Sequence, residues 1–475
     1  MLKLTLAKWR GAFRGENLPR IFQPHRVFLL LAAIFGFVIM LANPPCQAGD
    51  ESEHFVRAFQ ISEGTIVGQK GFGNTGGDLP KVAFWVGDPE GISFHYEKKM
   101  TRAIFLKKLN PLFVDWKKAE RTFCGFPHSV VYPPAGYIPQ TLAIFFGRHA
   151  HIGPLGLMYL ARTAGLLASI GLAYAALRCL PVYRWSAMIL LLSPMSLYLF
   201  GSVAPDGFLI SGTFLLVALA LKFCTREGGD VPWPYQVAIM SLAAALAVVK
   251  GVYLPFSFVA CLLVLPHLGR RRNQIIWVVA FALLCLVPVW LWSRVVTAVY
   301  MPGRSDIPID PVAQSLFIRT HPLTFLHVVA TSLQDEYVGI YQWFVGVLSW
   351  GDTYLPTWFY WTFGGGLLAC VIAESPGAFV VRWWQRLLMF ATAVATALLI
   401  VLAQYLIWNS PGSLTPIESI QGRYFIPVAI LVVASFPAIR RLPHPKPNLA
   451  VFASALGALN AIVCLVAVVQ RFYIE

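Results

Sequence analysis

The sequence predicts an all-α polytopic membrane protein. Hydrophobic residues make up 57% of the 475 residues, which exceeds the roughly 45–50% found in soluble domains. Long apolar runs recur at close spacing, and each approaches the roughly 20 residues that a helix needs to cross the hydrocarbon core. The alternating pattern of a membrane β-barrel is absent, so we expect the spans to be helical.

The first span, Val27 to Ala42, follows a basic leader at residues 1–26. The leader carries Lys or Arg at six positions and a single acid, Glu16, which places the N-terminus in the cytoplasm by the positive-inside rule. Because the leader is too long for a usual signal peptide, the span is expected to remain uncleaved. The net charge of +15 is therefore interpreted as a topology signal, and no nucleic-acid partner is predicted.

Residues 43–153 form the largest polar stretch and are expected to lie outside the cytoplasm. Within them, Tyr137 to Phe146 is apolar but too short to cross the membrane, so it is predicted to be a juxtamembrane helix on the outer surface. If it crossed, the basic triplet Arg270–Arg272 would move to the outer side, against the positive-inside rule. The sequence thus favours one large first outer loop.

Ten further spans are predicted, which makes eleven with the first. They divide into a module at 154–297 and a C-terminal group at 358–475, separated by a second outer loop at 298–357. Inside that loop, Pro322 to Leu348 is either a surface or re-entrant helix or two added crossings, for a total of 11 to 13. The ten spans are Pro154–Leu177, Trp185–Gly201, Phe208–Phe223, Tyr235–Val249, Tyr253–Leu268, Ile275–Val296, Trp358–Ala373, Leu387–Trp408, Phe425–Ala438 and Leu449–Val469.

A cluster of ionisable residues follows the first span directly, in the stretch NPPCQAGDESEHFVRAFQISEG. If a helix starts at Asp50 or Ser52, then Asp50, His54 and Arg57 fall at i, i+4 and i+7 and share one face. That face would meet a substrate at the membrane surface. The alternative is a capped surface helix with a solvated acidic start.

The outer ends of later spans collect further ionisable residues. They are Asp206 in SVAPD, Lys250 in VVKGVY, Asp352 in SWGDTYLP and Arg423 in SIQGRYF. Taken singly, each has an ordinary explanation, such as an N-cap for Asp206 or snorkelling for the two bases. Because ionisable groups near membrane depth usually face a cavity, their gathering on one side predicts a site there.

The cysteines give one indication of the compartment. Of eight cysteines, only Cys46 and Cys124 lie in the large outer loop. An oxidising exterior would let these two form a disulfide. No metal, redox or nucleotide motif stands in a usable context.

The opening cluster resembles the motif PPxxxxDExxHxxRAxxISxG of a domain-of-unknown-function family of predicted bacterial membrane proteins. SVAPD, WGDTYLP and QGRYFIP resemble later motifs of that family. The resemblance extends over most of the chain, about residues 27 to 435.

The layout is in turn similar to the GT-C glycosyltransferase fold. VYPPAGYIPQTLAIFFGRHA, with the following span that contains ARTAG, resembles the KPP-containing juxtamembrane helix and span of the lipid A aminoarabinose and protein mannosyl transferases. Here Tyr132 stands in place of the Lys. The resemblance implies sugar transfer from a polyprenyl-phosphate donor to an extracytoplasmic glycan or lipid-linked acceptor, at the outer face of the bacterial inner membrane.

An inverting transfer needs a base for the acceptor proton and cationic groups for the departing phosphate. Asp50 is predicted to be the base, with Glu51 as the alternate. The predicted phosphate-binding residues are Arg423, His54, Arg57 and Lys250. The predicted sugar or acceptor contacts are Asp206, Asp352, Tyr137, Gln421 and Tyr424. Apolar spans below would hold the prenyl tail. No metal site is predicted, and a divalent ion between Asp50 and Asp206 is left open.

Two other classes keep the lipid-linked glycan. A transporter or flippase of lipid-linked sugars would show internal repeats and broken helices in two halves, and no convincing repeat is visible. An O-antigen polymerase or ligase normally has its largest loop late in the chain, whereas here it comes first. Release of free lipid phosphate distinguishes a transferase from a flippase.

Overall fold

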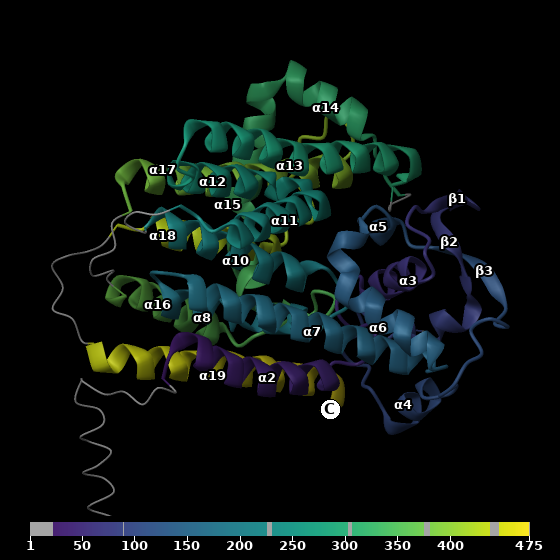
Figure 1. Ribbon diagram of the computed structural model, residues 1–475. Coiled ribbons are helices and arrows are strands. Elements are labelled where there is room, and N and C mark those ends of the chain that lie inside the picture. The colour runs from purple at the N-terminus through teal and green to yellow at the C-terminus, as the bar shows by residue number, and fades with distance from the viewer. Residues whose placement is uncertain are drawn as a thin grey trace, which may run out of the picture.

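The computed structural model describes residues 22–88, 90–225, 230–302, 306–374, 381–437 and 446–474. Most of these residues form helices that lie side by side, and a small mixed domain sits at one end of the bundle (Figure 1). The prediction of a helical polytopic membrane protein is confirmed at this level.

Six helices in the described ranges are long and apolar enough to cross a membrane. They are α2 (Pro24–Ala42), α7 (Pro154–Cys179), α10 (Asp206–Cys224), α13 (Arg271–Val299), α17 (Trp383–Trp408) and α19 (Lys446–Tyr473). Four shorter apolar segments accompany them: α11 (Trp233–Val249), η3–α12–η4 (Gly251–His267), α16 (Thr357–Ala373) and η5–α18 (Gly422–Ser435). Each coincides with a predicted span, although the number of crossings stays a prediction.

The remaining predicted span, Trp185 to Gly201, is two short helices. α8 (Arg184–Leu191) ends before α9 (Pro194–Phe200), because Pro194 has no N–H to continue the hydrogen-bond ladder. The hydroxyl of Ser193 accepts the N–H of Ser196 and so caps α9. Both pieces are buried in the bundle.

The small domain at this end of the bundle, called the outer domain after its predicted location, spans residues 44–153 and contains helices and a sheet. The antiparallel sheet has the order β1 (Gln69–Gly71), β2 (Asn74–Pro80), β3 (Arg121–Gly125), so this part is not all-α as predicted. Its helices are α3 (Glu51–Ser62), η1 (Lys81–Val86), α4 (Arg102–Lys108), α5 (Pro127–Val130), η2 (Pro134–Tyr137) and α6 (Ile138–His149). Phe55, Phe59, Trp116 and Phe126 form much of its core.

A buried ion pair fastens this domain to the bundle. The guanidinium of Arg162, on α7, donates to both carboxylate oxygens of Glu51 at 2.8 and 2.5 Å. It also donates to the carbonyls of Asn43 and Pro44 at 2.6 and 2.8 Å. Both charged side chains are 0% exposed, so the start of α3 is held at a fixed place on the end of α7.

The second outer segment contains α14 (Pro311–Thr320), α15 (Pro322–Gly346) and a two-stranded ribbon of β4 (Val347–Leu348) and β5 (Thr353–Tyr354). The uncertain stretch at 322–348 is thus one unbroken helix for most of its length, and α15 is not among the six candidate spans. η5 (Gly422–Phe425) packs directly on α15. The contact is so close that a Cβ at position 422 would lie 1.9 Å from the carbonyl oxygen of Ile340, so only glycine fits there. Because Arg423 follows Gly422 directly, this close approach fixes the position of its backbone beside α15.

The first and last helices run parallel. The hydroxyl of Tyr473 donates to the carbonyl of Ala42 at 2.9 Å, and the N–H of Met100 donates to the carbonyl of Phe472 at 2.8 Å. The C-terminal end of α19 therefore lies beside the outer domain (Figure 1). If the chain crosses the membrane an odd number of times, as predicted, the first and last helices cross it in the same direction, which agrees with this arrangement.

Candidate functional site

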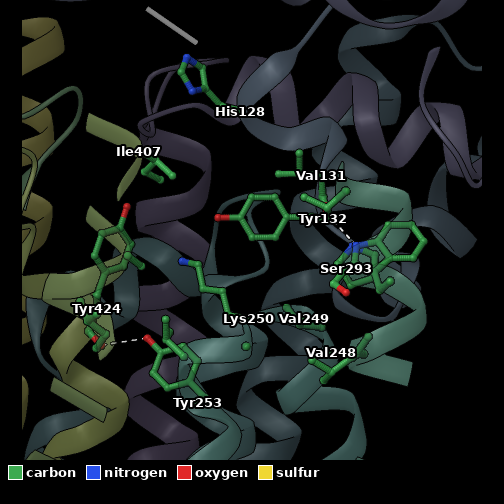
Figure 2. Close-up of a pocket in the computed structure, with 18 of the residues that line it drawn as sticks. His128, Val131, Tyr132, Val248, Val249, Lys250, Tyr253, Ser293, Ile407 and Tyr424 are labelled. Atoms are coloured by element: carbon green, nitrogen blue, oxygen red, sulfur yellow. Dashed lines mark hydrogen bonds between the residues drawn. The ribbon is translucent and has the colours of Figure 1, made fainter. Parts of the chain in front are cut away.

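The candidate site is a cavity of about 580 Å³ where the outer domain meets the bundle. Its lining comes from α3, α5, the following loop, the start of α10, the α11–η3 turn, α13, α17 and η5 (Figure 2). Segments from most of the chain length thus contribute. The polar lining residues are Asp50, His54, His128, Tyr132, Asp206, Lys250, Tyr253, Trp292, Ser293, Thr297, Gln404, Trp408, Arg423 and Tyr424.

Asp50 and Arg423 face each other across the upper part of the cavity. The Nη2 atom of Arg423 lies 3.8 Å from Oδ2 of Asp50, and their side chains are 9% and 40% exposed. This separation is longer than the 2.7–2.9 Å of a tight charge-assisted hydrogen bond. The Nε–H of Arg423 is buried and has no hydrogen-bond partner in the described residues. The guanidinium therefore has donors available for an anionic ligand.

Asp50 precedes α3 at the N-cap position, but its side chain does not cap the helix. Its backbone is left-handed, with φ 60°. Ordinarily an Asp at this position would accept an N–H of the first turn. Here the carboxylate is left to line the cavity.

Lys250 and Asp206 form the second charge pair of the cavity. Nζ of Lys250 donates to Oδ1 of Asp206 at 3.1 Å. The amine lies between the rings of Tyr132 and Tyr424, at 5.7 and 4.3 Å from their centroids (Figure 2). These distances fall within cation–π range. The N-cap of α10 is Pro205, and Asp206 is the first residue of the helix; its carboxylate accepts from Lys250.

His54 contributes a neutral hydrogen-bond donor. The Tyr137 hydroxyl lies 2.6 Å from Nδ1 of His54, and burial raises the pKa of this phenol well above its usual value. It has no other hydrogen-bond partner in the described residues, so it donates to Nδ1 and the imidazole proton sits on Nε2. Burial lowers the pKa of His54 to about 4. The lowered pKa disfavours the charged form of His54, and its phosphate-binding role stays a prediction.

The lower wall of the cavity is apolar and comes from bundle helices. α11, α13 and α17 contribute Val248, Val249, Val289, Val296, Ile400, Ala403 and Ile407. Trp292 ties α13 to the outer domain, because its Nε1–H donates to the carbonyl of Val131 at 2.8 Å. The ring of His128 stacks on Trp408, with centroids 5.9 Å apart and planes within 4°. The wall thus continues from the charged groups toward the membrane-spanning part.

Five predicted site residues do not line this cavity. Glu51 is occupied by Arg162, as described above. Arg57 is buried and donates to the carbonyls of Tyr132 and Ile66 and to the side chain of Gln60. Tyr137 lies behind His54. Asp352 accepts two hydrogen bonds from Arg471, at 2.9 and 3.1 Å. Gln421 precedes η5 and is partly buried. Arg57 and Tyr137 position lining residues rather than contact a ligand there.

The predicted disulfide is absent. Cys46 and Cys124 are both free. The Cys46 thiol is buried and donates to the carbonyl of Val86 at 3.1 Å, while Cys124 belongs to β3 and pairs with Gly77 across the sheet. The domain is held by its core and ion pairs instead.

The cavity is lined by two carboxylates that could contact a metal ion, those of Asp50 and Asp206. No group of three or more His, Cys, Asp or Glu side chains that could hold a metal ion occurs in the described part of the chain. Asp50 and Asp206 both line the cavity, but Asp206 is occupied by Lys250. The divalent ion left open by the sequence thus has two carboxylates and no third such ligand.

Sequence reasoning did not assign several lining residues. Tyr132 was noticed only as a replacement for Lys, while Tyr253, His128, Trp408 and Gln404 were not selected. The Tyr253 hydroxyl donates to the carbonyl of Tyr424 at 2.9 Å and so fixes η5. The sequence offered one indication of this role, the position of Tyr253 three residues after Lys250 in VVKGVY. Aromatic residues are frequent elsewhere in the chain, so aromatic character alone did not distinguish it.

Fold and site together define a polytopic membrane protein with a charged cavity between its helix bundle and a small domain. The chain belongs to the family described as predicted membrane protein (DUF2142), whose model matches residues 32–432. This confirms the family expected from the opening motif. No curated protein and no solved structure matches the chain, and the similarity to the GT-C fold stays a prediction.

Proposed function

We propose that this protein is a membrane glycosyltransferase that uses a polyprenyl-phosphate-linked sugar and an extracytoplasmic glycan or lipid-linked acceptor. One observation carries the proposal. A carboxylate and an incompletely satisfied guanidinium lie 3.8 Å apart, in a cavity that is also lined by apolar side chains of α11, α13 and α17. This combination suits a donor with an anionic head and a hydrocarbon tail.

The partners of Lys250 and Arg423 indicate which of these two cations would hold an anionic donor. Asp50 and Asp206 oppose Lys250 and Arg423, while His54 is neutral because burial lowers its pKa to about 4. Lys250 already has a carboxylate within hydrogen-bond distance. Arg423 is therefore assigned to the donor phosphate, since its planar fork can hold two phosphate oxygens.

The proposed reaction is a single displacement. The acceptor hydroxyl oxygen attacks the anomeric carbon, the bond from that carbon to the phosphate oxygen breaks, and the lipid phosphate leaves with the bonding electrons. Asp50 takes the acceptor proton, and Arg423 stabilises the charge that develops on the phosphate. The Nε2–H of His54 and the Tyr132 and Tyr424 hydroxyls supply uncharged hydrogen bonds to sugar oxygens.

The apolar wall suits the prenyl chain. Each buried methylene of a lipid chain contributes about 0.8 kcal/mol. The wall is built by α11, α13 and α17, two of which are long enough to span a membrane. A lipid whose phosphate contacts Arg423 would thus keep its tail at the level of the hydrocarbon core.

The test is transfer by purified protein in liposomes that contain a radiolabelled polyprenyl-phosphate sugar. The wild type should release free polyprenyl phosphate and label an added glycan acceptor. Asp50→Asn should lower the rate by about 10²–10⁴-fold, the contribution of a general base. Arg423→Ala should lower it by about 10²-fold or more, as for other removed transition-state donors.

The matched control is Asp115→Asn, which neutralises a carboxylate elsewhere in the outer domain, 45% exposed. Its transfer rate should equal that of the wild type. If the lipid-linked sugar moves intact between leaflets with no release of lipid phosphate, the protein is a flippase and the proposal fails. Full transfer by folded Asp50→Asn would remove Asp50 from the role of base.

A further inference from the structure

A second cavity, of about 340 Å³, lies on the outer domain and shares no lining residue with the first. It is formed by η1, the loop that follows, and the end of α4. Its lining residues are Lys81, Phe84, Trp85, Gly87, Asp88, Glu90, Lys107 and Lys108. The proposed transfer reaction does not use any of them.

Trp85 presents a fixed aromatic surface in this cavity. Its side chain is 42% exposed, and its Nε1–H donates to the carbonyl of Lys107 at 3.3 Å. This hydrogen bond restrains the indole. The electron-rich face of such a ring attracts the partly positive C–H bonds of a ligand, and sugar rings present such C–H bonds on one face.

Glu90 supplies a carboxylate that forms ion pairs with Lys107 and Lys108 at this cavity. Its side chain is 14% exposed, and both carboxylate oxygens are buried without a hydrogen-bond partner in the described residues. The Lys108 and Lys107 amines lie 3.1 and 3.7 Å away as charges, but Lys108 donates to the carbonyl of Gly87. A carboxylate offers about four lone-pair positions, so hydroxyl donors from a ligand would add to the two ion pairs of Glu90.

Each lysine of the cavity lies within ion-pair distance of an acidic side chain. Lys81, Lys107 and Lys108 stand against Asp88 and Glu90, and Lys81 also pairs with Glu120. The Asp88 carboxylate is already occupied by the N–H groups of Ile92 and Ser93, at 3.0 and 2.7 Å. A site whose cations are paired in this way does not select an ionic ligand. It suits a neutral molecule with many hydroxyls and one apolar face.

We propose that this second cavity is a saccharide-binding site, in which a pyranose ring packs on Trp85, donates hydroxyls to Glu90 and accepts hydrogen bonds from Lys107. The inference does not depend on the transfer reaction, because the two cavities are lined by different residues.

The test is saturation-transfer NMR on the full chain in detergent micelles. The probes are the methyl glycosides of glucose, mannose, galactose, rhamnose and N-acetylglucosamine. At least one should show saturation with the wild type and an equal signal with the control Asp115→Asn, which lines neither cavity. Trp85→Ala and Glu90→Gln should each reduce that signal tenfold or more, while Trp85→Phe, which keeps an aromatic face, should retain part of it.

Three results would overturn the site. One is the absence of saturation with all five glycosides, and another is an unchanged signal in both Trp85→Ala and Glu90→Gln. The third is loss of the signal in Arg423→Ala alone, which would place sugar binding in the first cavity. Failure of the transfer assay leaves these measurements unaffected, so the two proposals can fail separately.

Discussion

At the residue scale, Asp50 combines a strained backbone with an unused capping position. A left-handed conformation costs a non-glycine residue about 1–2 kcal/mol, and Asp50 adopts φ 60°. The usual benefit of Asp at an N-cap, about 1 kcal/mol, is not gained because the side chain makes no capping hydrogen bond. Strained residues of this kind cluster at functional sites.

A glycine at position 50 separates the backbone strain of Asp50 from the proposed role of its carboxylate. Asp50→Gly relieves the backbone strain, so the thermal unfolding temperature should be equal to or higher than that of the wild type. Transfer should fall by about 10²–10⁴-fold because the base is gone. Thermal unfolding in detergent and the liposome assay measure the two effects. A stable Asp50→Gly protein with normal transfer would contradict the assignment.

Glu53 makes stability depend on pH near neutrality. Its carboxylate accepts the N–H groups of His128 and Ser129 at 2.9 and 3.1 Å. Burial, followed by the charge of Asp50, nevertheless raises the pKa of Glu53 from 4.5 to about 7. Because the folded pKa exceeds the unfolded one, this residue's contribution to stability is fully present below pH 4.5 and is lost as the pH rises through 7.

Glu53→Gln should remove this dependence. The variant keeps an acceptor for the α5 amides, so its unfolding temperature should change less between pH 5 and pH 8.5 than that of the wild type. The measurement is thermal unfolding across that range, with Glu120→Gln as the control at an exposed position. Identical pH profiles for wild type and Glu53→Gln would show that Glu53 does not titrate there.

The sequence identified the charged lining residues but could not separate them from buried pairs. Asp206, Lys250, Asp352 and Arg423 were predicted because ionisable groups near membrane depth are costly, and Asp50 because of its position in the acidic motif. All of these except Asp352 line one cavity. Glu51 satisfied the same criterion as Asp50. Its partner Arg162 stands 111 positions away in the sequence, and nothing local announces that pairing. Distinguishing a free charge from a neutralised one requires the tertiary contact.

At the element scale, the start of α3 is fixed by one interaction from α7. Arg162 neutralises Glu51. It also donates to the carbonyls of Asn43 and Pro44, the first two residues after α2. Asp50 immediately precedes Glu51. The orientation of the proposed base is thus a consequence of a buried ion pair in which neither partner reaches the cavity.

Arg162→Leu should destabilise the fold by about 3–5 kcal/mol, since it leaves Glu51 buried without a counter-charge. Arg121→Leu is the matched control. That arginine pairs with Glu63 and Asp78 but is 40% exposed, so its loss should cost about 0–1 kcal/mol. The yield of monodisperse protein and its unfolding temperature report both effects. Equal stability of the two variants would argue against the anchoring role of Arg162.

Sequence patterns predicted the bundle elements better than the outer domain. Hydropathy located the long helices because lipid requires continuous apolar segments. The break at Ser193–Pro194 was visible in the sequence but lies inside a continuous apolar run. The strand Asn74–Pro80 has the sequence NTGGDLP, whose residues have low strand propensity. It is a strand because β3 pairs with it closely: a Cβ on Gly76 would lie 1.6 Å from the carbonyl oxygen of Cys124.

At the scale of the whole molecule, the outer domain, the end of α2 and the end of α19 gather at one end of the bundle (Figure 1). Arg471, near the end of α19, donates to Asp352 and to four carbonyls between Ile92 and Lys98. The last helix is therefore joined to both outer segments. If the domain is extracytoplasmic, so is the end of α19.

Single cysteines in a cysteine-free background test this topology. Glu120→Cys and Ile474→Cys should react with a membrane-impermeant maleimide on intact spheroplasts, because both positions are exposed at the outer-domain end. Arg271→Cys, at the exposed start of α13, should react only after permeabilisation. Labelling of position 271 in intact cells, with position 120 protected, would reverse the predicted orientation.

The facing of Asp50 and Arg423 has a consequence for biosynthesis. A ribosome delivers the carboxylate shortly after the first helix, but the guanidinium emerges only after α17 has been made. Throughout that interval a nascent chain contains the proposed base, Asp50, without the proposed phosphate-binding residue, Arg423. Under the proposed mechanism, transfer would therefore begin only when insertion is nearly finished, and a prematurely terminated chain that lacks η5 would be inert toward the lipid pool around it.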